Sequence, residues 1–214
     1  MGRPPRIDIA GLIYHVTARG NYRQNIFRSE ADKEHYIWLL AHYQQEYGVR
    51  LFAFVLMDNH VHLLLERPQS TSLGEIVKTL HGRFSKQINR ERRQVGHLFQ
   101  GRFYSLIVEE DAYLLELTRY IHLNPVRAGM VESPDQYRWG SARTYLGLDY
   151  YPFIDRTYLA LFGQRPQTRY EKYKAFLAEG MIQKTNPMQN IQEGRFLASL
   201  EFIKQVKQAW EASL

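Results

Sequence analysis

The chain of 214 residues contains no cysteine. Disulfides and thiolate metal sites are therefore excluded, and a reducing compartment is compatible with the composition. No apolar run approaches the roughly 18–20 residues that a membrane-spanning helix needs. The first residues, Met1 to Arg6, also lack the apolar core of a signal peptide. We therefore expect a soluble, cytoplasmic protein with no membrane partner.

Acidic residues are outnumbered, with 22 Asp and Glu against 28 Lys and Arg, which gives a net charge of +6. A basic balance favours an anionic partner such as nucleic acid, although a modest excess is also compatible with plain solubility. The hydrophobic content of 44% and aromatic content of 14% indicate a globular chain. The length allows one full core, or one core with an appendage.

A histidine pair follows the longest apolar segment. Residues 51–57 are all apolar, as in a strand buried on both faces, and Asp58-Asn59 is a turn signal. Residues 60–65 then read as the returning strand, which places His60 and His62 on one face, about 7 Å apart. Two such imidazoles can reach one cation. The alternative is a packed histidine beside a turn-capping one, because two ligands alone do not make a metal site.

The local signals predict three long helices in the first 130 residues and a further helix near the end. Ser29 and Ser72 are candidate N-caps, and Gly48 is a candidate C-terminal stop. Pro125 disfavours helix at the preceding residue, so the third helix should stop near residue 124. The expected helices are 30–47, 73–88, 109–124 and 196–210, and further strands are expected at 12–18 and 105–108.

Basic residues cluster in two segments. Five arginines fall within the first 28 residues against one acid, and seven basic residues against one acid lie between Lys78 and Arg102, with aromatic residues near the end. Basic charge with interleaved aromatic rings suits a single-stranded nucleic acid, whose unpaired bases can stack. The alternative is an ordinary solvated surface. The candidate DNA-binding residues are Arg3, Arg6, Arg19, Arg23, Arg83, Lys86, Arg90 and Arg102.

Tyr120 and Asn124 share one face of the third helix, one turn apart. A tyrosine can attack a phosphodiester and keep the bond energy in a covalent phosphotyrosine. Two imidazoles with one amide oxygen would hold a divalent cation and leave positions open for substrate. The alternatives are a packed tyrosine and an asparagine that caps a turn. His122, next to Tyr120 in the helix, could act as a base or contact DNA, but it does not share the face of Tyr120 and Asn124. His15 is interpreted as structural.

Four segments carry a family resemblance. They are residues 14–21 (YHVTARGN), 59–63 (NHVHL), 120–129 (YIHLNPVRAG) and 139–141 (WGS). In this order and spacing they resemble the HUH single-strand nucleases, and among these the REP-associated tyrosine transposases. The resemblance covers about residues 3–147.

The resemblance implies an α+β protein with a ferredoxin-like antiparallel sheet and helices, the HUH endonuclease fold. Residues 1–147 would form the catalytic domain. Residues 148–214 lie outside the resemblance, and their own pattern predicts a helical C-terminal extension that tunes DNA binding or covers the active site and that the sheet does not need. On this view a fragment ending near Gly147 stays folded.

The resemblance also implies the site and its chemistry. Mg²⁺ or Mn²⁺ would be held by His60, His62 and Asn124. Tyr120 would attack a single-stranded DNA phosphate and leave a 5′-phosphotyrosine and a free 3′-OH. The substrate would be a palindromic repeat hairpin next to a short guide tetranucleotide, and the process DNA transposition. The protein would be a monomer or a homodimer.

Two other functions stay open at this point. One is a hairpin-binding regulator that descends from a transposase and does not cut, and the other is an HUH replication or mobilisation nickase. The presence of His60, His62 and Tyr120 together favours an active enzyme, and a nickase usually carries further domains. A histidine-triad hydrolase is disfavoured, because Leu64 stands where its third histidine should be.

Overall fold

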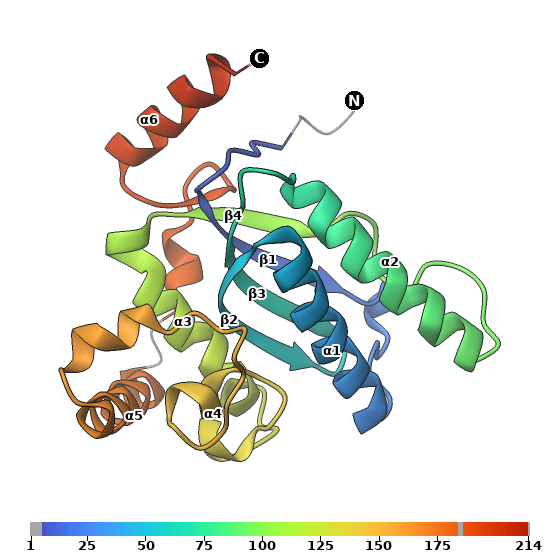
Figure 1. The fold of residues 1–214 in the computed structure, drawn as a ribbon, viewed down its shortest axis with the longest axis horizontal. Coiled ribbons are helices and arrows are strands. Elements are labelled where there is room, and N and C mark those ends of the chain that lie inside the picture. Colours follow the sequence, from blue (N-terminus) through green and yellow to red (C-terminus); the bar gives the residue numbers. More distant parts are fainter. Residues whose placement is uncertain (1–5, 184–185, 214) are drawn as a thin grey trace.

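A computed structural model describes residues 6–183 and 186–213 of the chain. Five strands form one sheet in the order β2-β3-β1-β4-β5 (Figure 1). The strands are β1 (Ile13–Arg19), β2 (Arg50–Met57), β3 (His60–Glu66), β4 (Tyr104–Val108) and β5 (Phe196–Leu197). The first four pair antiparallel, whereas β5 runs parallel to β4 at the edge. The predicted α+β class is confirmed, with one parallel edge strand added to the antiparallel sheet.

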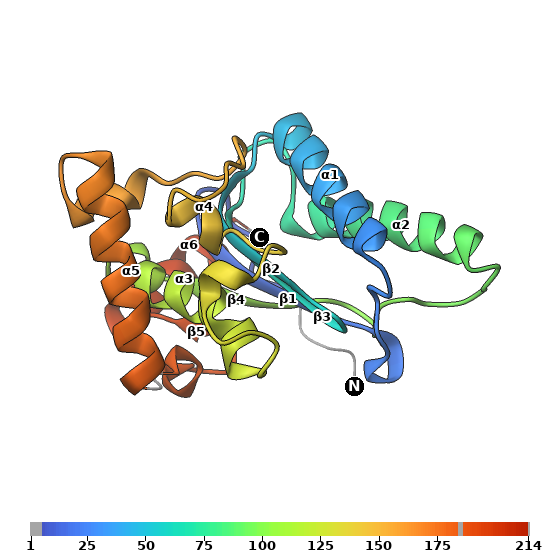
Figure 2. The ribbon, with the colours of Figure 1, turned by 90° about the horizontal axis from the view of Figure 1, so that it is seen from below.

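Helices cover both faces of this sheet. The helices are α1 (Glu30–Tyr47), α2 (Leu73–Glu91), α3 (Glu110–Arg127), α4 (Ala142–Tyr145), α5 (Pro166–Gln183) and α6 (Leu200–Glu211). Figure 2 shows α1 and α2 together on one side of the sheet, and α3 and α5 on the other. Among the described residues, no helix is both long and apolar enough to span a bilayer.

The first two helices begin where their capping residues predict. The Ser29 hydroxyl accepts from the backbone N–H of Asp32 at 3.2 Å, and the Asp32 carboxylate accepts from the N–H of Ser29 at 3.1 Å. Ser72 accepts from the N–H of Glu75 at 3.1 Å in the same way. Gly48, with φ +66°, ends α1 in the left-handed conformation that glycine favours.

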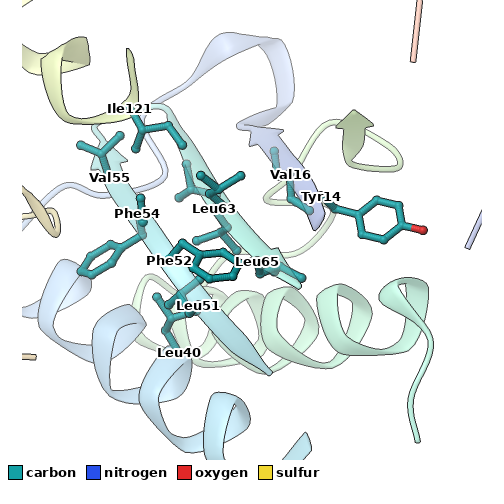
Figure 3. Packing of buried hydrophobic residues seen from close by; sticks show 14 of the residues in the cluster. Tyr14, Val16, Leu40, Leu51, Phe52, Phe54, Val55, Leu63, Leu65 and Ile121 are labelled. Carbon is teal, nitrogen blue, oxygen red and sulfur yellow. The ribbon is translucent and has the colours of Figure 1, made fainter. Parts of the chain in front are cut away.

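Side chains of β3 alternate between the face covered by α1 and α2 and the histidine-bearing face, and the hydrophobic core extends over both. Leu63 and Leu65 point toward α1 and α2, where they pack with Leu40 in the core (Figure 3). His62 lies on the opposite face, directly across from Val55 of β2. The predicted alternation along this strand is therefore confirmed.

The prediction that the third helix stops near Asn124 is wrong. Helix α3 continues through Pro125 to Arg127, and Gly129, with φ +68°, follows it. Pro125 lies in the last turn, where its missing N–H removes a single backbone hydrogen bond. The carbonyl groups of Asn124 and Pro125 still accept from Ala128 and Met130 at 2.9 Å each, so the turn is completed.

The C-terminal extension is not purely helical. Phe196 and Leu197, predicted as the start of the last helix, form β5 and pair with Ile107 and Val108 of β4. Helix α6 starts only after Ser199, which caps it and also donates to the Glu109 carboxylate. The extension therefore completes one edge of the sheet. Whether residues 1–147 fold without it stays a prediction.

Candidate active site

The histidine pair and Tyr120 meet on the face of the sheet that α3 covers. The ring centres of His60 and His62 lie 5.0 Å apart, with the ring planes at 77°. The Tyr120 ring of α3 lies 6.1 Å from the His62 ring, edge to face. Strand β1 places Thr17 beside His62 and Arg19 beside His60 in the same rows. The structure thus brings His60, His62 and Tyr120 together, as predicted for the catalytic site.

Both site histidines use Nδ1 for a hydrogen bond. Nδ1 of His60 lies 2.6 Å from the Asn59 amide oxygen, which can only accept, so His60 carries its proton on Nδ1. The Asn59 amide group is held in this orientation because its nitrogen donates to the carbonyl of Arg23 at 3.3 Å. Nδ1 of His62 lies 2.8 Å from Nε2 of His15. Neither Nε2 of the pair is hydrogen-bonded within the described residues.

Burial keeps these imidazoles neutral. Burial, with the positive charge of Arg19 added, lowers the pKa of His60 to about 4. Burial also lowers the pKa of His62 well below its ordinary value, with His15, His60 and Arg19 adding to the shift. A neutral imidazole has a lone pair to offer, and it is the form that ligates metals. At pH 7 both imidazoles are therefore neutral, as metal ligation requires.

Tyr120 is half-buried and borders a hollow of about 590 Å³, together with Asn124, Arg127 and residues of the extension that include Met181 and Asn186. Burial raises the pKa of the Tyr120 phenol, and the positive charge of Arg127 partly opposes that shift. The Arg127 guanidinium lies 4.9 Å from the centre of the Tyr120 ring. The phenol is therefore protonated at neutral pH and lies beside a cation that would stabilise its anion.

Asn124 follows Tyr120 by one turn of α3 and lines the same hollow. Its amide nitrogen donates to the carbonyl of Tyr120, one turn earlier, at 2.9 Å. Within the part of the chain that the structure describes, no three histidine, cysteine or carboxylate side chains are placed to hold a metal together. The role of Asn124 as a third ligand stays a prediction.

His122 and His15 occupy different environments. Both ring nitrogens of His122 are engaged at 2.7 Å, one with the Tyr173 hydroxyl of α5 and one with the Ser141 hydroxyl. His122 therefore links α3 to α5 and to Ser141 through hydrogen bonds. Because it is buried and both ring nitrogens are engaged, it is placed neither as a base nor as a DNA contact. His15, read as structural from the sequence, instead contacts the site through His62. Strand alternation predicts which face of β1 His15 occupies, but its contact with His62 follows only from the pairing of β1 with β3.

The predicted basic residues divide between the two faces. Arg19 is exposed beside His60, and Arg23 lies at the turn that holds Asn59. The predicted residues Arg83, Lys86 and Arg90 are exposed on α2, on the other side of the sheet from α3 (Figure 2). The structure therefore does not bring these three to the histidine pair. Arg3 lies outside the described residues.

A second hollow, of about 620 Å³, gathers three arginines. Arg6, Arg102 and Arg195 line it with Tyr104, and none of its lining residues is acidic. The Arg6 guanidinium lies 3.6 Å from the centre of the Phe103 ring and donates to the Phe103 carbonyl at 2.7 Å, which holds it in place. Arg195 was not predicted from the sequence, because nothing local connects it with residues 90 positions earlier.

This hollow adjoins the histidine-bearing face. Thr17 of β1 pairs with His62 on one side and with Tyr104 on the other, so these three residues form one row across the sheet. Directly paired residues point to the same face, and two strand spacings place Tyr104 about 10 Å from His62. The Tyr104 hydroxyl donates to the carbonyl of Gly194 at 2.7 Å, which fixes the extension at this edge.

Known proteins share both the sequence and the fold. Residues 8–124 match the sequence model of the family described as "Transposase IS200 like". Over 118 residues the chain is 25% identical to a protein of Haemophilus influenzae named as a REP-associated tyrosine transposase, a match that covers 50% of this chain and 67% of that one. A solved structure of a REP-associated tyrosine transposase bound to a REP hairpin has the same fold, with a TM-score of 0.58 and 17% identity over 77% of this chain and 98% of that one. Since the family model covers more than half of its residues, the chain belongs to the IS200-like transposase family.

Proposed function

We propose that this transposase is a metal-dependent single-stranded DNA endonuclease and strand transferase that cuts palindromic repeat hairpins through a 5′-phosphotyrosine. The observation that carries the proposal is the convergence of Tyr120 with His60 and His62 on one face of the sheet. Hairpin DNA as the partner is supported by the solved relative, which is bound to a REP hairpin.

The histidine pair fits a divalent cation. Nε2 of His60 and Nε2 of His62 make no hydrogen bond within the described residues, and burial keeps both rings neutral. With Asn124 as the proposed third ligand, the remaining positions go to oxygen atoms of water and phosphate, which suits Mg²⁺ or Mn²⁺. When bound, such a cation supplies Lewis-acid polarisation of a phosphodiester oxygen.

Tyr120 is the proposed nucleophile. Its phenol oxygen forms a bond to phosphorus while the bond from phosphorus to the 3′ oxygen breaks. The phenol loses its proton and the leaving 3′ oxygen gains one, so no net proton is consumed. Arg127 stabilises the phenolate that forms at Tyr120. Arg19, exposed beside His60, is placed to meet the negative charge of the phosphate.

The two hollows suggest how the unpaired strand crosses this face. One is lined by Arg6, Arg102 and Arg195 and the other by Tyr120 and Arg127. His62 shares a row of the sheet with Tyr104 of the first hollow, and its ring lies 6.1 Å from that of Tyr120 in the second. Guanidinium groups bind phosphate oxygens, and the Tyr104 ring offers a surface on which a base can stack. We assign the first hollow to the DNA flank beside the hairpin.

The test is a covalent adduct. Wild-type protein is incubated with a hairpin oligonucleotide that carries unpaired flanks and a 3′ label, in Mn²⁺ or in EDTA, and resolved on a denaturing gel. We expect a labelled protein–DNA adduct in Mn²⁺ and none in EDTA, because a 5′-phosphotyrosine retains the DNA on the 3′ side of the cut.

The matched control is a second tyrosine on the same helix. Tyr113→Phe should form the adduct, whereas Tyr120→Phe should bind the hairpin and form none. An adduct that persists in Tyr120→Phe would show that another residue is the nucleophile. Hairpin binding without any adduct or cleavage would instead favour a regulator that does not cut.

A further inference from the structure

His15 and His62 form a buried pair of imidazoles on the neighbouring strands β1 and β3. Nε2 of His15 lies 2.8 Å from Nδ1 of His62, the ring planes differ by 8°, and the ring centres are 5.0 Å apart. A nitrogen–nitrogen contact this short between nearly coplanar rings is a hydrogen bond. Only 2% of His15 and 6% of His62 is exposed, so the bond is shielded from water.

Two proton arrangements satisfy this hydrogen bond, because a neutral imidazole carries a single proton. In the first, Nδ1–H of His62 donates to Nε2 of His15, and Nε2 of His62 keeps a free lone pair. In the second, Nε2–H of His15 donates to Nδ1 of His62, and the proton of His62 then occupies its Nε2. Only the first arrangement leaves His62 able to bind a cation through Nε2.

His60, the other histidine of the site, has only one possible proton arrangement. Asn59 presents an amide oxygen to Nδ1 of His60, and that oxygen can only accept. His15, by contrast, has its own Nδ1 buried without a hydrogen-bond partner among the described residues. The Thr17 hydroxyl also lies near this pair, 3.5 Å from Nε2 of His15 and 3.3 Å from Nδ1 of His62, and it can either donate or accept. Among the residues that the structure describes, the hydrogen-bonding contacts of the His15 ring are with His62 and Thr17, so these determine where its proton lies.

We propose that His15 is a positioning residue of the metal site. As the acceptor for Nδ1–H of His62, it holds the tautomer and the ring orientation in which Nε2 of His62 faces the cation. Acceptors of this kind orient metal-ligating histidines and raise their basicity, and their loss lowers metal affinity about 10–100-fold. The inference rests on the proposed function, which makes His60 and His62 the ligands.

The direct test is the tautomer in the wild-type protein. In protein labelled with ¹⁵N-histidine, long-range correlation spectra assign each ring nitrogen as protonated or unprotonated. With saturating Mg²⁺ we expect His62 to be protonated on Nδ1, and His15 to be protonated on Nδ1 with a bare Nε2. A proton on Nε2 of His15 in the Mg²⁺-loaded protein would overturn the proposal.

The second test is Mn²⁺ affinity, measured from the electron paramagnetic resonance signal of free Mn²⁺. His15→Phe keeps a planar ring but offers no acceptor, so its affinity should fall at least tenfold. His15→Gln restores an acceptor oxygen and should bind within threefold of wild type. His81→Phe removes another buried histidine, on α2 against Tyr36, and should leave the affinity unchanged. Binding of hairpin DNA in EDTA should stay within twofold for all three variants.

The outcomes separate this inference from the proposed function. If wild-type protein binds Mn²⁺ and His15→Phe binds it equally well, the role of His15 is overturned and the metal site stands. If Mg²⁺ changes no ¹⁵N shift of His60 or His62 in wild-type protein, the ligand assignment itself fails, and the role of His15 fails with it.

Discussion

His122 makes the stability of the protein sensitive to acid. Its Nε2 contacts the Ser141 hydroxyl and its Nδ1 contacts the Tyr173 hydroxyl, at 2.7 Å each. In the neutral ring one of these nitrogens donates and the other accepts. A second proton on the ring would remove that acceptor and bury a charge, because only 1% of His122 is exposed. Burial accordingly lowers the pKa of His122 to about 3.

The sign and the size of the effect follow from linkage. The ordinary pKa is 6.5 and the folded value is about 3, so below pH 6.5 the unfolded chain binds a proton at His122 that the folded chain does not. Protonation of His122 therefore does not affect the free energy of unfolding above pH 6.5, and it lowers that free energy as the pH drops toward 3. At about 1.4 kcal/mol per pH unit, acidification to pH 5 removes about 2 kcal/mol at this one residue. That is a large part of the 5–15 kcal/mol that stabilises a typical domain.

The assay is urea unfolding of wild type and His122→Gln at pH 8 and pH 5. Glutamine can donate and accept but does not titrate. At pH 8 we expect the variant to be less stable by about 1–3 kcal/mol, the cost of imperfectly paired buried groups. At pH 5 this deficit should shrink by about 2 kcal/mol, because only the unfolded wild-type chain is stabilised by a proton at residue 122. His42→Gln, which removes an exposed histidine of α1, is the control. A deficit that is equal at both pH values would refute the reasoning.

Three further outcomes are expected. His60→Ala and His62→Ala should each abolish cleavage while most hairpin affinity remains in a gel-shift titration, because the basic surface supplies the affinity. The single-turnover cleavage rate should rise steadily between pH 6 and pH 9, since burial raises the pKa of Tyr120 and the phenolate fraction grows with pH; a rate that falls over this range would argue against a tyrosine nucleophile. Arg195→Ala should weaken binding of a flanked hairpin and reduce the salt slope by about 1, whereas Lys204→Ala, an exposed charge on α6, should not.

Local chemistry accounts for the parts of the fold that the sequence predicts well. Ser29 and Ser72 hydrogen-bond backbone N–H groups three residues ahead, and Gly48 adopts the left-handed conformation, so the information lies within a few residues. The shared face of His60 and His62 is equally local, because it depends only on strand alternation. The shared face of Tyr120 and Asn124 follows from the helical repeat, and both residues border one hollow.

The features that could not be predicted depend on distant pairing. The contact of His15 with His62 requires the antiparallel register of β1 against β3, which no local pattern encodes. Phe196 and Leu197 suit an amphipathic helix by spacing, but their pairing with β4 makes them a strand. Local preference also failed at Pro125, because packing and the completed last turn outweigh the loss of one backbone hydrogen bond.

The placement of the extension changes how the site is understood. Residues 181 and 186 help to line the hollow that holds Tyr120, and residues 194 and 195 help to line the hollow beside Tyr104. Both site histidines, and the residues Thr17 and Tyr104 in the row of His62, come from strands before residue 147. Apart from Arg127, the groups proposed for chemistry therefore lie in the family-matched residues 8–124, whereas the walls of both hollows are shared with the extension. A change confined to the extension would then alter which DNA is held while the cutting groups stay in place.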